Sequence, residues 1–495
     1  RLGGVGERRC RGAAIRWATG RRRAVTSSEC WRVAGPVGAG VRAGSIGAGP
    51  VGRGIVERYS ETKGIRMSRV GRIVGVGRGP RLASWAAAGA CVVGVGALSM
   101  AAVASPRADD GNPLTSTPSE ESALPPEGGW WWRSATEELL PVELLDERTM
   151  DVTLADVDDD GDLDVFVARE FATNVLLLNQ GFGEMIGLAS VFSAEKTDTE
   201  AVAVAELNGD GALDVVFVNE DTLTNELYLG SPGGLAFTEA SDRLPTAGKS
   251  NAVAAFDADG DGDVDLFIGN DGQNHLLLND GAANFMDATA ANLPAAAEVT
   301  QDVQVGDIDG DGDLDVVVAN EGRNRVLVND GSGTFADETA RRLPLRATAE
   351  VTRQAALGDA DGDGDLDVYF ANTSWAADAD PRDRLLINDG NGNFTDESEL
   401  RIPAVSGPTL DATFVDLDDD GDLDLLAASF FPGGVVVLVN RGGGRFVDET
   451  ALWVPSGQPG QATDVEAADF DRDGTLDVYV AHWQSGPDQL LIGGG

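Results

Sequence analysis

Seven short segments of the chain carry carboxylates at alternate positions, a spacing that suits cation binding. Each follows the pattern D-x-D-x-D-G-x-x-D or a close variant of it. Side chains at alternate positions of a tight loop converge on one point, and the glycine allows the positive φ that the turn requires. The candidate metal ligands are Asp156, Asp158, Asp160 and Asp164; Glu206, Asn208, Asp210 and Asp214; Asp257, Asp259, Asp261 and Asp265; Asp307, Asp309, Asp311 and Asp315; Asp359, Asp361, Asp363 and Asp367; Asp416, Asp418, Asp420 and Asp424; and Asp469, Asp471, Asp473 and Asp477.

Calcium is the cation that these loops are expected to bind, with up to seven ions per chain. Magnesium demands a stricter octahedron and keeps its waters, whereas Ca²⁺ accepts irregular sets of oxygen ligands. The loops are not EF-hands, because Val167 and Ile268 stand where a twelfth-position glutamate would be. The second site should be the weakest, since Glu206 and Asn208 replace aspartates there. The alternative is that the segments are solvated acidic turns.

Short β-strands must position these loops. The first acids of successive loops are 50, 51, 50, 52, 57 and 53 residues apart, a period typical of propeller blades. In the fourth unit the apolar run 314–319 is followed by strand 325–328, an Asn-Asp-Gly type turn and strand 335–339. The period-two patterning excludes helical repeats. The sequence therefore predicts an all-β chain, a seven-bladed β-propeller of four-stranded antiparallel blades with a calcium loop in each blade.

A segment before the first loop is expected to close the ring. Trp132 lies nine residues before Pro141 and Thr136 takes the threonine position, as in the Phe-x-Asp-x-Thr…Leu-Pro phrase that ends most units. No acidic loop precedes this segment, and the last unit lacks such a strand at Gly495. The segment should therefore supply the missing outer strand and remove a free sheet edge.

These repeats resemble the FG-GAP or VCBS-type repeat proteins, the family of the integrin α-subunit propeller. The resemblance covers about residues 130–495 and rests on units such as Asp307-Ile308-Asp309-Gly310-Asp311-Gly312 with Asn329-Asp330-Gly331. It implies the propeller architecture and calcium loops. The Phe-Gly and Gly-Ala-Pro signatures are not clearly present in the repeats. The resemblance therefore says little about function.

The N-terminal region and the charge bound the setting of the protein. Residues 1–66 are expected to be unstructured or translated upstream sequence, 67–104 a secretory signal peptide ending in Ala102-Val103-Ala104, 105–129 a flexible linker and 130–495 the propeller. An uncleaved membrane anchor is the alternative for the signal segment, and only then is a membrane a partner. We expect a secreted, periplasmic or cell-surface protein with a monomeric propeller. The formal net charge of −45 makes nucleic acid an improbable partner.

Unusual side chains between the second and third strands of the last three units, together with Trp453 on the connection between the last two units, predict a ligand patch. It would lie on the face opposite the calcium loops and bind a protein or a carbohydrate. Its residues are Trp375, Phe430, Phe431, Trp453, His482 and Trp483. The alternative is that these side chains pack against one another or on adjacent blades. A second candidate is the mouth of the central channel, where a mostly acidic ring would hold a cation or a basic group, or be a hydrated lining. The ring comprises Asp151, Glu200, Asn251, Asp302, Arg353, Asp411 and Asp464.

Two classes of function fit this pattern. The first is an adhesion or recognition module. The second is a calcium-dependent polysaccharide lyase or hydrolase on a propeller scaffold, which needs a convergent acid and base. Beyond the predicted cleavage point the histidines are His275 and His482, far apart in the sequence, and the cysteines Cys10, Cys30 and Cys91 all precede it. No catalytic residue is therefore assigned, and the recognition module is the favoured interpretation.

Overall fold

The computed structural model of the chain describes residues 131–141, 148–221, 224–245, 248–346, 350–373, 380–404, 407–431, 433–483 and 486–494. All of them belong to one compact unit, Trp85–Gly495. The predicted segments 1–66, 67–104 and 105–129 lie outside the described residues. Within the described part, no helix is both long and apolar enough to cross a membrane.

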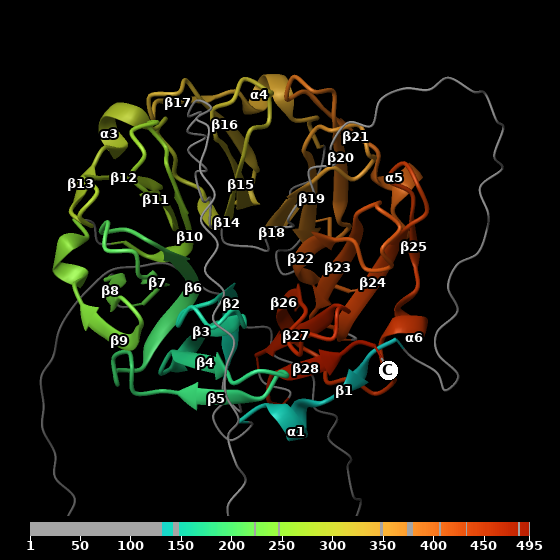
Figure 1. The fold of residues 1–495 in the computed structure, drawn as a ribbon. Coiled ribbons are helices and arrows are strands. Elements are labelled where there is room, and N and C mark those ends of the chain that lie inside the picture. The colour runs from blue at the N-terminus through green and yellow to red at the C-terminus, as the bar shows by residue number, and fades with distance from the viewer. Residues whose placement is uncertain are drawn as a thin grey trace, which may run out of the picture. The chain divides into compact units, whose positions relative to one another are not determined.

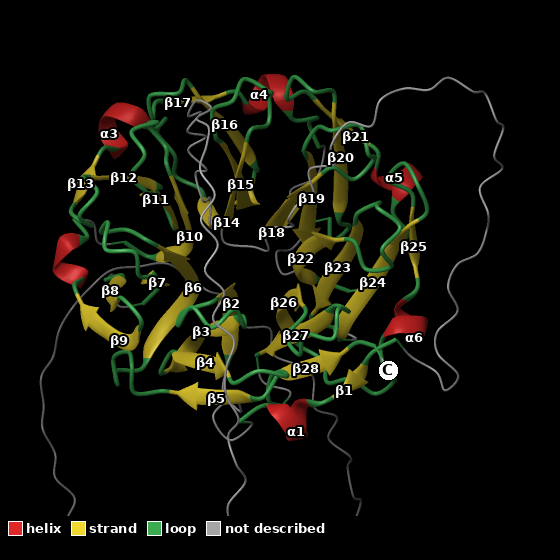
Figure 2. Cartoon of the chain, in the orientation of Figure 1, coloured by secondary structure: helices red, strands yellow, loops and turns green. Residues whose placement is uncertain are grey.

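The described residues form antiparallel sheets in which four strand positions recur (Figure 2). The first strands are β2 (Thr149–Ala155), β6 (Thr197–Ala205), β10 (Ser250–Phe256), β14 (Val299–Gly306), β18 (Glu350–Gly358), β22 (Thr409–Val415) and β26 (Ala462–Ala468). The second strands are β3 (Asp164–Ala172), β7 (Asp214–Asn219), β11 (Asp265–Asn270), β15 (Asp315–Gly322), β19 (Asp367–Asn372), β23 (Asp424–Ser429) and β27 (Asp477–His482). An acidic loop joins each first strand to its second strand.

The third and fourth strands complete each unit. The third strands are β4 (Val175–Asn179), β8 (Glu226–Ser231), β12 (His275–Asn279), β16 (Arg325–Asn329), β20 (Arg384–Asn388), β24 (Gly434–Asn440) and β28 (Gln489–Ile492). The fourth strands are β5 (Met185–Leu188), β9 (Gly234–Glu239), β13 (Phe285–Asp287), β17 (Phe335–Asp337), β21 (Phe394–Asp396), β25 (Phe446–Asp448) and β1 (Arg133–Ser134). Short helical turns follow most fourth strands: α1 (Thr136–Leu139), η1 (Ser241–Arg243), α3 (Thr289–Asn292), α4 (Thr339–Arg342), α5 (Ser398–Arg401) and α6 (Thr450–Trp453).

The units follow one another around a closed ring (Figure 1). Each first strand contacts the first strand of the next unit, and β26 contacts β2. The ring is closed by β1, which pairs with β28 through Arg133 opposite Ile492 and Ser134 opposite Leu491. This pairing confirms that the Trp132 segment supplies the outer strand of the last unit, and it leaves no unpaired outer edge on β28.

The hydrophobic core lies between neighbouring sheets, which explains the continuous apolar runs of the second strands. In β15, Val316 and Val318 pack in a cluster with the preceding unit. Val317 and Ala319 point the other way and pack in a cluster with the following unit. Successive side chains of a strand point to opposite faces, so a strand covered on both faces must be apolar at every position.

Polar contacts join neighbouring units at the end opposite the acidic loops. Before six of the seven third strands, all except β24, an Asn or Asp caps its own second strand and bonds to Thr or Ser in the next first strand. The described pairs are Asn174 with Thr199 (3.2 Å), Asn225 with Ser250 (3.0 Å), Asn274 with Thr300 (2.9 Å), Asn324 with Thr352 (2.8 Å), Asp383 with Thr409 (2.8 Å) and Asp488 with Thr149 (2.8 Å). The last pair spans the ring closure, so the same bond that joins consecutive units also joins the two ends of the ring.

Candidate metal centres and ligand surface

The acidic loops share one backbone geometry, which the first acid and the glycine create together. In the first loop, Asp160 and Gly161 donate their backbone N–H groups to Asp156, at 3.1 and 2.8 Å. Gly161 has a φ of 87°, which a side chain would strain. Hydrogen bonds within the loop therefore already hold its backbone around the first carboxylate.

The ninth residue of each loop ties it to the sheet. Asp315 accepts a hydrogen bond from the backbone of Asn329 at the end of β16 (2.9 Å) and another from Ile308 inside the loop (3.2 Å). The equivalent aspartates in all seven loops make the same two kinds of bond. Burial raises the pKa of Asp315 to about 7. Each ninth carboxylate is thus a fixed, desolvated group at the base of its loop.

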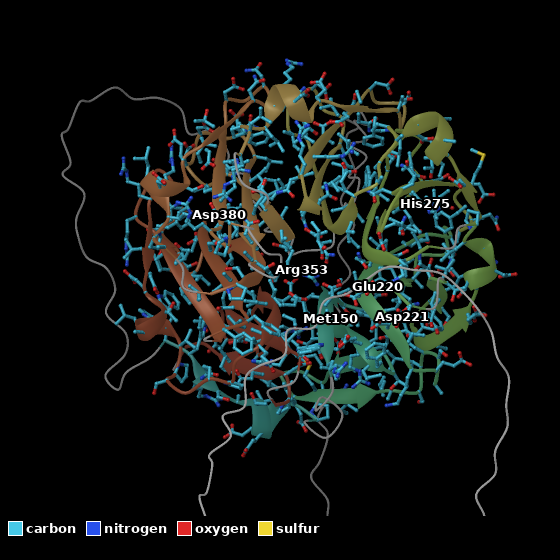
Figure 3. The ribbon with its side chains drawn as sticks, turned by 180° about the vertical axis from the view of Figure 1, so that it is seen from behind. Met150, Glu220, Asp221, His275, Arg353 and Asp380 are labelled. Atoms are coloured by element: carbon cyan, nitrogen blue, oxygen red, sulfur yellow. The ribbon has the colours of Figure 1, made fainter. Side chains whose placement is uncertain are left out.

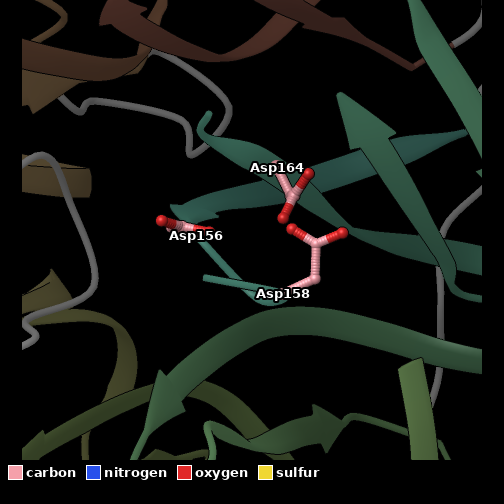
Figure 4. Close-up of side chains that lie close together, drawn as sticks. All are labelled: Asp156, Asp158 and Asp164. Atoms are coloured by element: carbon pink, nitrogen blue, oxygen red, sulfur yellow. The ribbon is translucent and has the colours of Figure 1, made fainter. Parts of the chain in front are cut away.

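The donor set fits a hard divalent cation. Carboxylate oxygens of Asp156, Asp158 and Asp164 lie within 4.8 Å of one another, and Figure 4 shows the three side chains gathered together. The Oδ1 atoms of Asp158, Asp309, Asp361, Asp416 and Asp418 are buried and have no hydrogen-bond partner among the described residues. A buried, unpaired carboxylate oxygen is costly, and a bound cation would satisfy it. These oxygens therefore suit the calcium ions that the sequence predicts.

The second loop differs in its interior. Glu206 accepts bonds from the backbone of Asn208 and Gly209, at 2.9 and 2.6 Å. The Asn208 amide nitrogen donates to both oxygens of Asp214, at 3.2 and 3.1 Å. An amide N–H cannot coordinate a cation and here occupies the acceptor atoms of a predicted ligand. This contact gives a physical reason to expect weaker cation binding in this loop.

Two arginines, which sequence reasoning did not find, approach acidic loops from the helical turns α4 and α5 that follow the outer strands. Arg342 donates to Asp309 and to the Asn391 carbonyl of the next unit, both at 2.7 Å. Arg401 donates in the same way to Asp361 (3.1 Å) and to Gly443. Both arginines stand three residues after the Thr or Ser that opens the helical turn. They therefore occupy equivalent positions in their units, and aligning the repeats could have identified them. They link a loop of one unit to a turn of the next.

Trp453 occupies the same repeat position as these arginines, and its assignment to an exposed patch is wrong. It is 5% exposed and packs on Trp131 and Trp132, with ring centroids 5.2 Å away in both pairs. It fills the space between α6, which follows β25, and the segment that leads into β1. His482 is completely buried, and burial lowers its pKa to about 4. Both side chains therefore belong to the core, as the packing alternative held.

The remaining patch residues take part in a row of side chains that crosses three units, here called the aromatic ladder. Its members are Phe431, Phe430, Trp483, Arg148 and Phe171. Ring centroids of Phe430 lie 4.8 Å from Phe431 and 5.9 Å from Trp483. The Arg148 guanidinium lies 4.9 Å from the Trp483 ring and 5.5 Å from the Phe171 ring. Phe431 and Phe171 are 54% and 47% exposed, whereas Phe430 is mostly buried. Trp375 lies outside the described residues.

Glu170 holds the middle of the ladder. It accepts a hydrogen bond from Arg148 at 2.9 Å and another from the Trp483 indole. Phe171 has a φ of 57°, a left-handed conformation that is unusual for an aromatic residue. Sequence reasoning missed Phe171 and Arg148, because the last unit meets the first only when the ring closes. A lone apolar residue at the end of β3, after an otherwise regular strand, was the available signal.

The structure brings the predicted channel-mouth residues together around a cavity of about 70 Å³. Four of the carboxylates also join neighbouring units by accepting backbone N–H groups. The bonds run from Val202 to Asp151, from Ala355 to Asp302, from Val465 to Asp411 and from Val152 to Asp464. Burial, followed by repulsion from Asp464, raises the pKa of Asp151 and Asp411 well above the usual range. These carboxylates therefore carry a structural role that neither sequence alternative included.

The solved structures that are similar to this chain include three with low sequence identity. An Agrocybe aegerita lectin that recognises non-reducing terminal N-acetylglucosamine is 18% identical, with 68% of this chain and 86% of that chain covered and a TM-score of 0.41. BBS1N in complex with ARL6DN is 11% identical, with 73% and 97% covered and a TM-score of 0.46. YCF48 bound to D1 peptide is 13% identical, with 74% and 97% covered and a TM-score of 0.44.

The sequence itself matches one family. None of the curated proteins matches the chain. The FG-GAP-like repeat matches residues 156–217, 207–268, 257–318, 307–370, 374–427 and 416–480. Five of the six matched segments run from an acidic loop into the next unit, the segment 374–427 begins after the fifth loop, and together they cover more than half of the chain. The chain belongs to the FG-GAP-like repeat family.

Proposed function

We propose that this protein is a secreted, calcium-stabilised seven-bladed propeller that recognises a carbohydrate or protein ligand through the aromatic ladder. The observation that carries the proposal is the ladder itself, with two exposed phenylalanines at its ends and a tryptophan and an arginine between them. Rigid aromatic side chains next to a paired arginine are typical of recognition surfaces. The ladder lies among the turns opposite the acidic loops, where sequence reasoning placed the ligand.

The seven blades are supported by the cyclic contacts of the first strands and by the fourth strand that β1 adds to the last unit. Calcium binding is supported by the converging carboxylates and by the buried, unpaired oxygens in several loops. Ions at one end would hold the loops while the turns at the other end stay open to ligand. A rigid scaffold that presents variable turns is the usual arrangement of binding sites.

Recognition is favoured over catalysis by the state of the polar groups in the ladder. Its carboxylate, Glu170, already accepts bonds from Arg148 and Trp483. His482 is buried beneath the surface rather than presented on it. A hydrolase or lyase would need an acid and a base facing one substrate. The surface instead offers flat apolar faces and a positioned cation.

The test is binding of the calcium-loaded full chain to a panel of immobilised oligosaccharides and purified cell-surface proteins. The double variant Phe171→Ala with Phe431→Ala should lose at least tenfold in affinity for whichever probe the unaltered protein binds. Leu400→Ala is the matched control, because Leu400 is also an exposed apolar side chain but lies in α5. Equal binding by the double variant and the control would refute the ladder as the site. Turnover of a polysaccharide probe by the purified protein would move it into the enzyme class.

A further inference from the structure

A second group of carboxylates lies far from the acidic loops, in the second unit. Oxygens of Asp198, Glu200 and Glu220 lie within 4.8 Å of one another. Asp198 and Glu200 belong to the start of β6, whereas the acidic loop follows its end at Glu206. Eight residues of extended chain span roughly 26 Å, so this cluster is separate from the loop of its own unit. Figure 3 shows Glu220 beside Asp221, viewed from behind.

The strand pairing explains why the three side chains converge. The Glu220 backbone N–H donates to the Asp198 carbonyl at 2.9 Å, which fixes the end of β7 against the start of β6. The pairing then shifts between Thr199 and Ala201, and Glu200 is the extra residue of this β-bulge. A bulge re-aims the side chain of its extra residue. Two strands thus supply three carboxylates to one point.

Asp198 provides an independent observation that points to a ligand. Its side chain is 5% exposed, and its Oδ1 has no hydrogen-bond partner among the described residues. The nearby side chains that act on it include Asp221 and Glu170, which are also acidic. Lys249 lies 3.3 Å from Glu220. A buried carboxylate oxygen with acidic neighbours lacks the partner that such groups normally have.

We propose that Asp198, Glu200 and Glu220 form a divalent-cation site that is distinct from the acidic loops. The donors are all carboxylate oxygens, which suit a hard cation such as calcium. The site lies at the same end as the aromatic ladder, because Glu170 pairs with Asp198 across β3 and β6 and accepts the bonds from Arg148 and Trp483. A cation bound here would offset part of the negative charge behind the ladder.

The fourth unit provides a matched control for this site. Glu321 takes the position of Glu220 there, but Val299 and Gln301 stand where Asp198 and Glu200 stand. Without the other two carboxylates, Glu321 should bind no cation. Asp198→Asn and Glu220→Gln should therefore each abolish one site, and Glu321→Gln should abolish none.

The experiment combines diffraction with a binding count, using terbium as the probe because it replaces calcium at oxygen sites. Crystals of the full chain soaked in terbium should show an anomalous peak between Asp198, Glu200 and Glu220. In equilibrium dialysis, Asp198→Asn and Glu220→Gln should bind one ion fewer than the unaltered protein and Glu321→Gln, with unchanged circular dichroism. No peak at these carboxylates, or equal ion counts in all four proteins, would overturn the proposal. The diffraction result stands even if a variant fails to fold.

Discussion

The buried Asp488 should make the stability of the closed ring depend on pH. Its carboxylate accepts bonds from Thr149, Tyr479 and the His482 backbone, each at 2.8 Å, and joins the last unit to the first. Burial raises its pKa from 3.8 to about 7. The folded protein thus holds this proton more tightly than the unfolded chain does. Stability from this group is fully present below pH 3.8 and is lost as the pH rises through 7.

The size of the effect follows from the two pKa values. Because the unfolded chain ionises Asp488 at lower pH than the folded protein does, this group lowers the free energy of unfolding by nearly 2 kcal/mol at pH 5 and by about 4 kcal/mol at pH 8, with one unit of pKa corresponding to about 1.4 kcal/mol. Asp488→Asn removes the titrating group and has natural precedent, since Asn174, Asn225, Asn274 and Asn324 occupy the same position in other units. Relative to the unaltered protein, the variant should therefore gain about 2.5 kcal/mol between pH 5 and pH 8.

Urea unfolding in excess calcium gives the free energy of unfolding of each protein at pH 5 and at pH 8. The change between the two pH values in the variant, minus the same change in the unaltered protein, is the double difference. Titrating groups that both proteins share cancel in it. Asp383→Asn is a graded companion, because burial raises the pKa of Asp383 only to about 6. Its gain over the same interval should be about 1.4 kcal/mol. Asn324→Asp should produce the opposite change, making the protein less stable at pH 8 than at pH 5. A double difference within about 0.5 kcal/mol of zero for Asp488→Asn would refute the reasoning.

Two further outcomes are expected. A chelator should lower the unfolding temperature, since each loop saturated at a hundred times its Kd adds about 2.7 kcal/mol to the free energy of unfolding. No thermal shift would mean that the loops are acidic turns. In a calorimetric titration with calcium, the Glu206 loop should fill last. Trp453→Ala should cost about 3–5 kcal/mol in urea unfolding, because the ring is buried against Trp131 and Trp132. The neighbouring, half-exposed Leu452→Ala is its control, and equal losses would contradict the buried role of Trp453.

Several features were predictable from sequence because they obey local rules that recur in every unit. The acidic loops, the strands around them and the outer strand supplied by the Trp132 segment all follow from spacing and alternation, and the pairing of β1 with β28 confirms the last of these. The channel-mouth residues were also predicted correctly as a group, since all of them lie near the start of a first strand and the first strands begin at the same end of the ring. Their bonds to neighbouring backbones could not be predicted, because those bonds depend on how closely the units stack.

The sequence by itself thus determined the repeat, the family and the candidate cation ligands. Only the tertiary structure decided which aromatic side chains are exposed: Trp453 is sealed by Trp132, while Phe171 joins Trp483 through Arg148. It also decided that Asp198, Glu200 and Glu220 converge. The physical reason is that a strand pattern tells which face a side chain takes but not what covers that face. Here the covering residues come from the neighbouring unit, and at the ring closure from the far end of the chain.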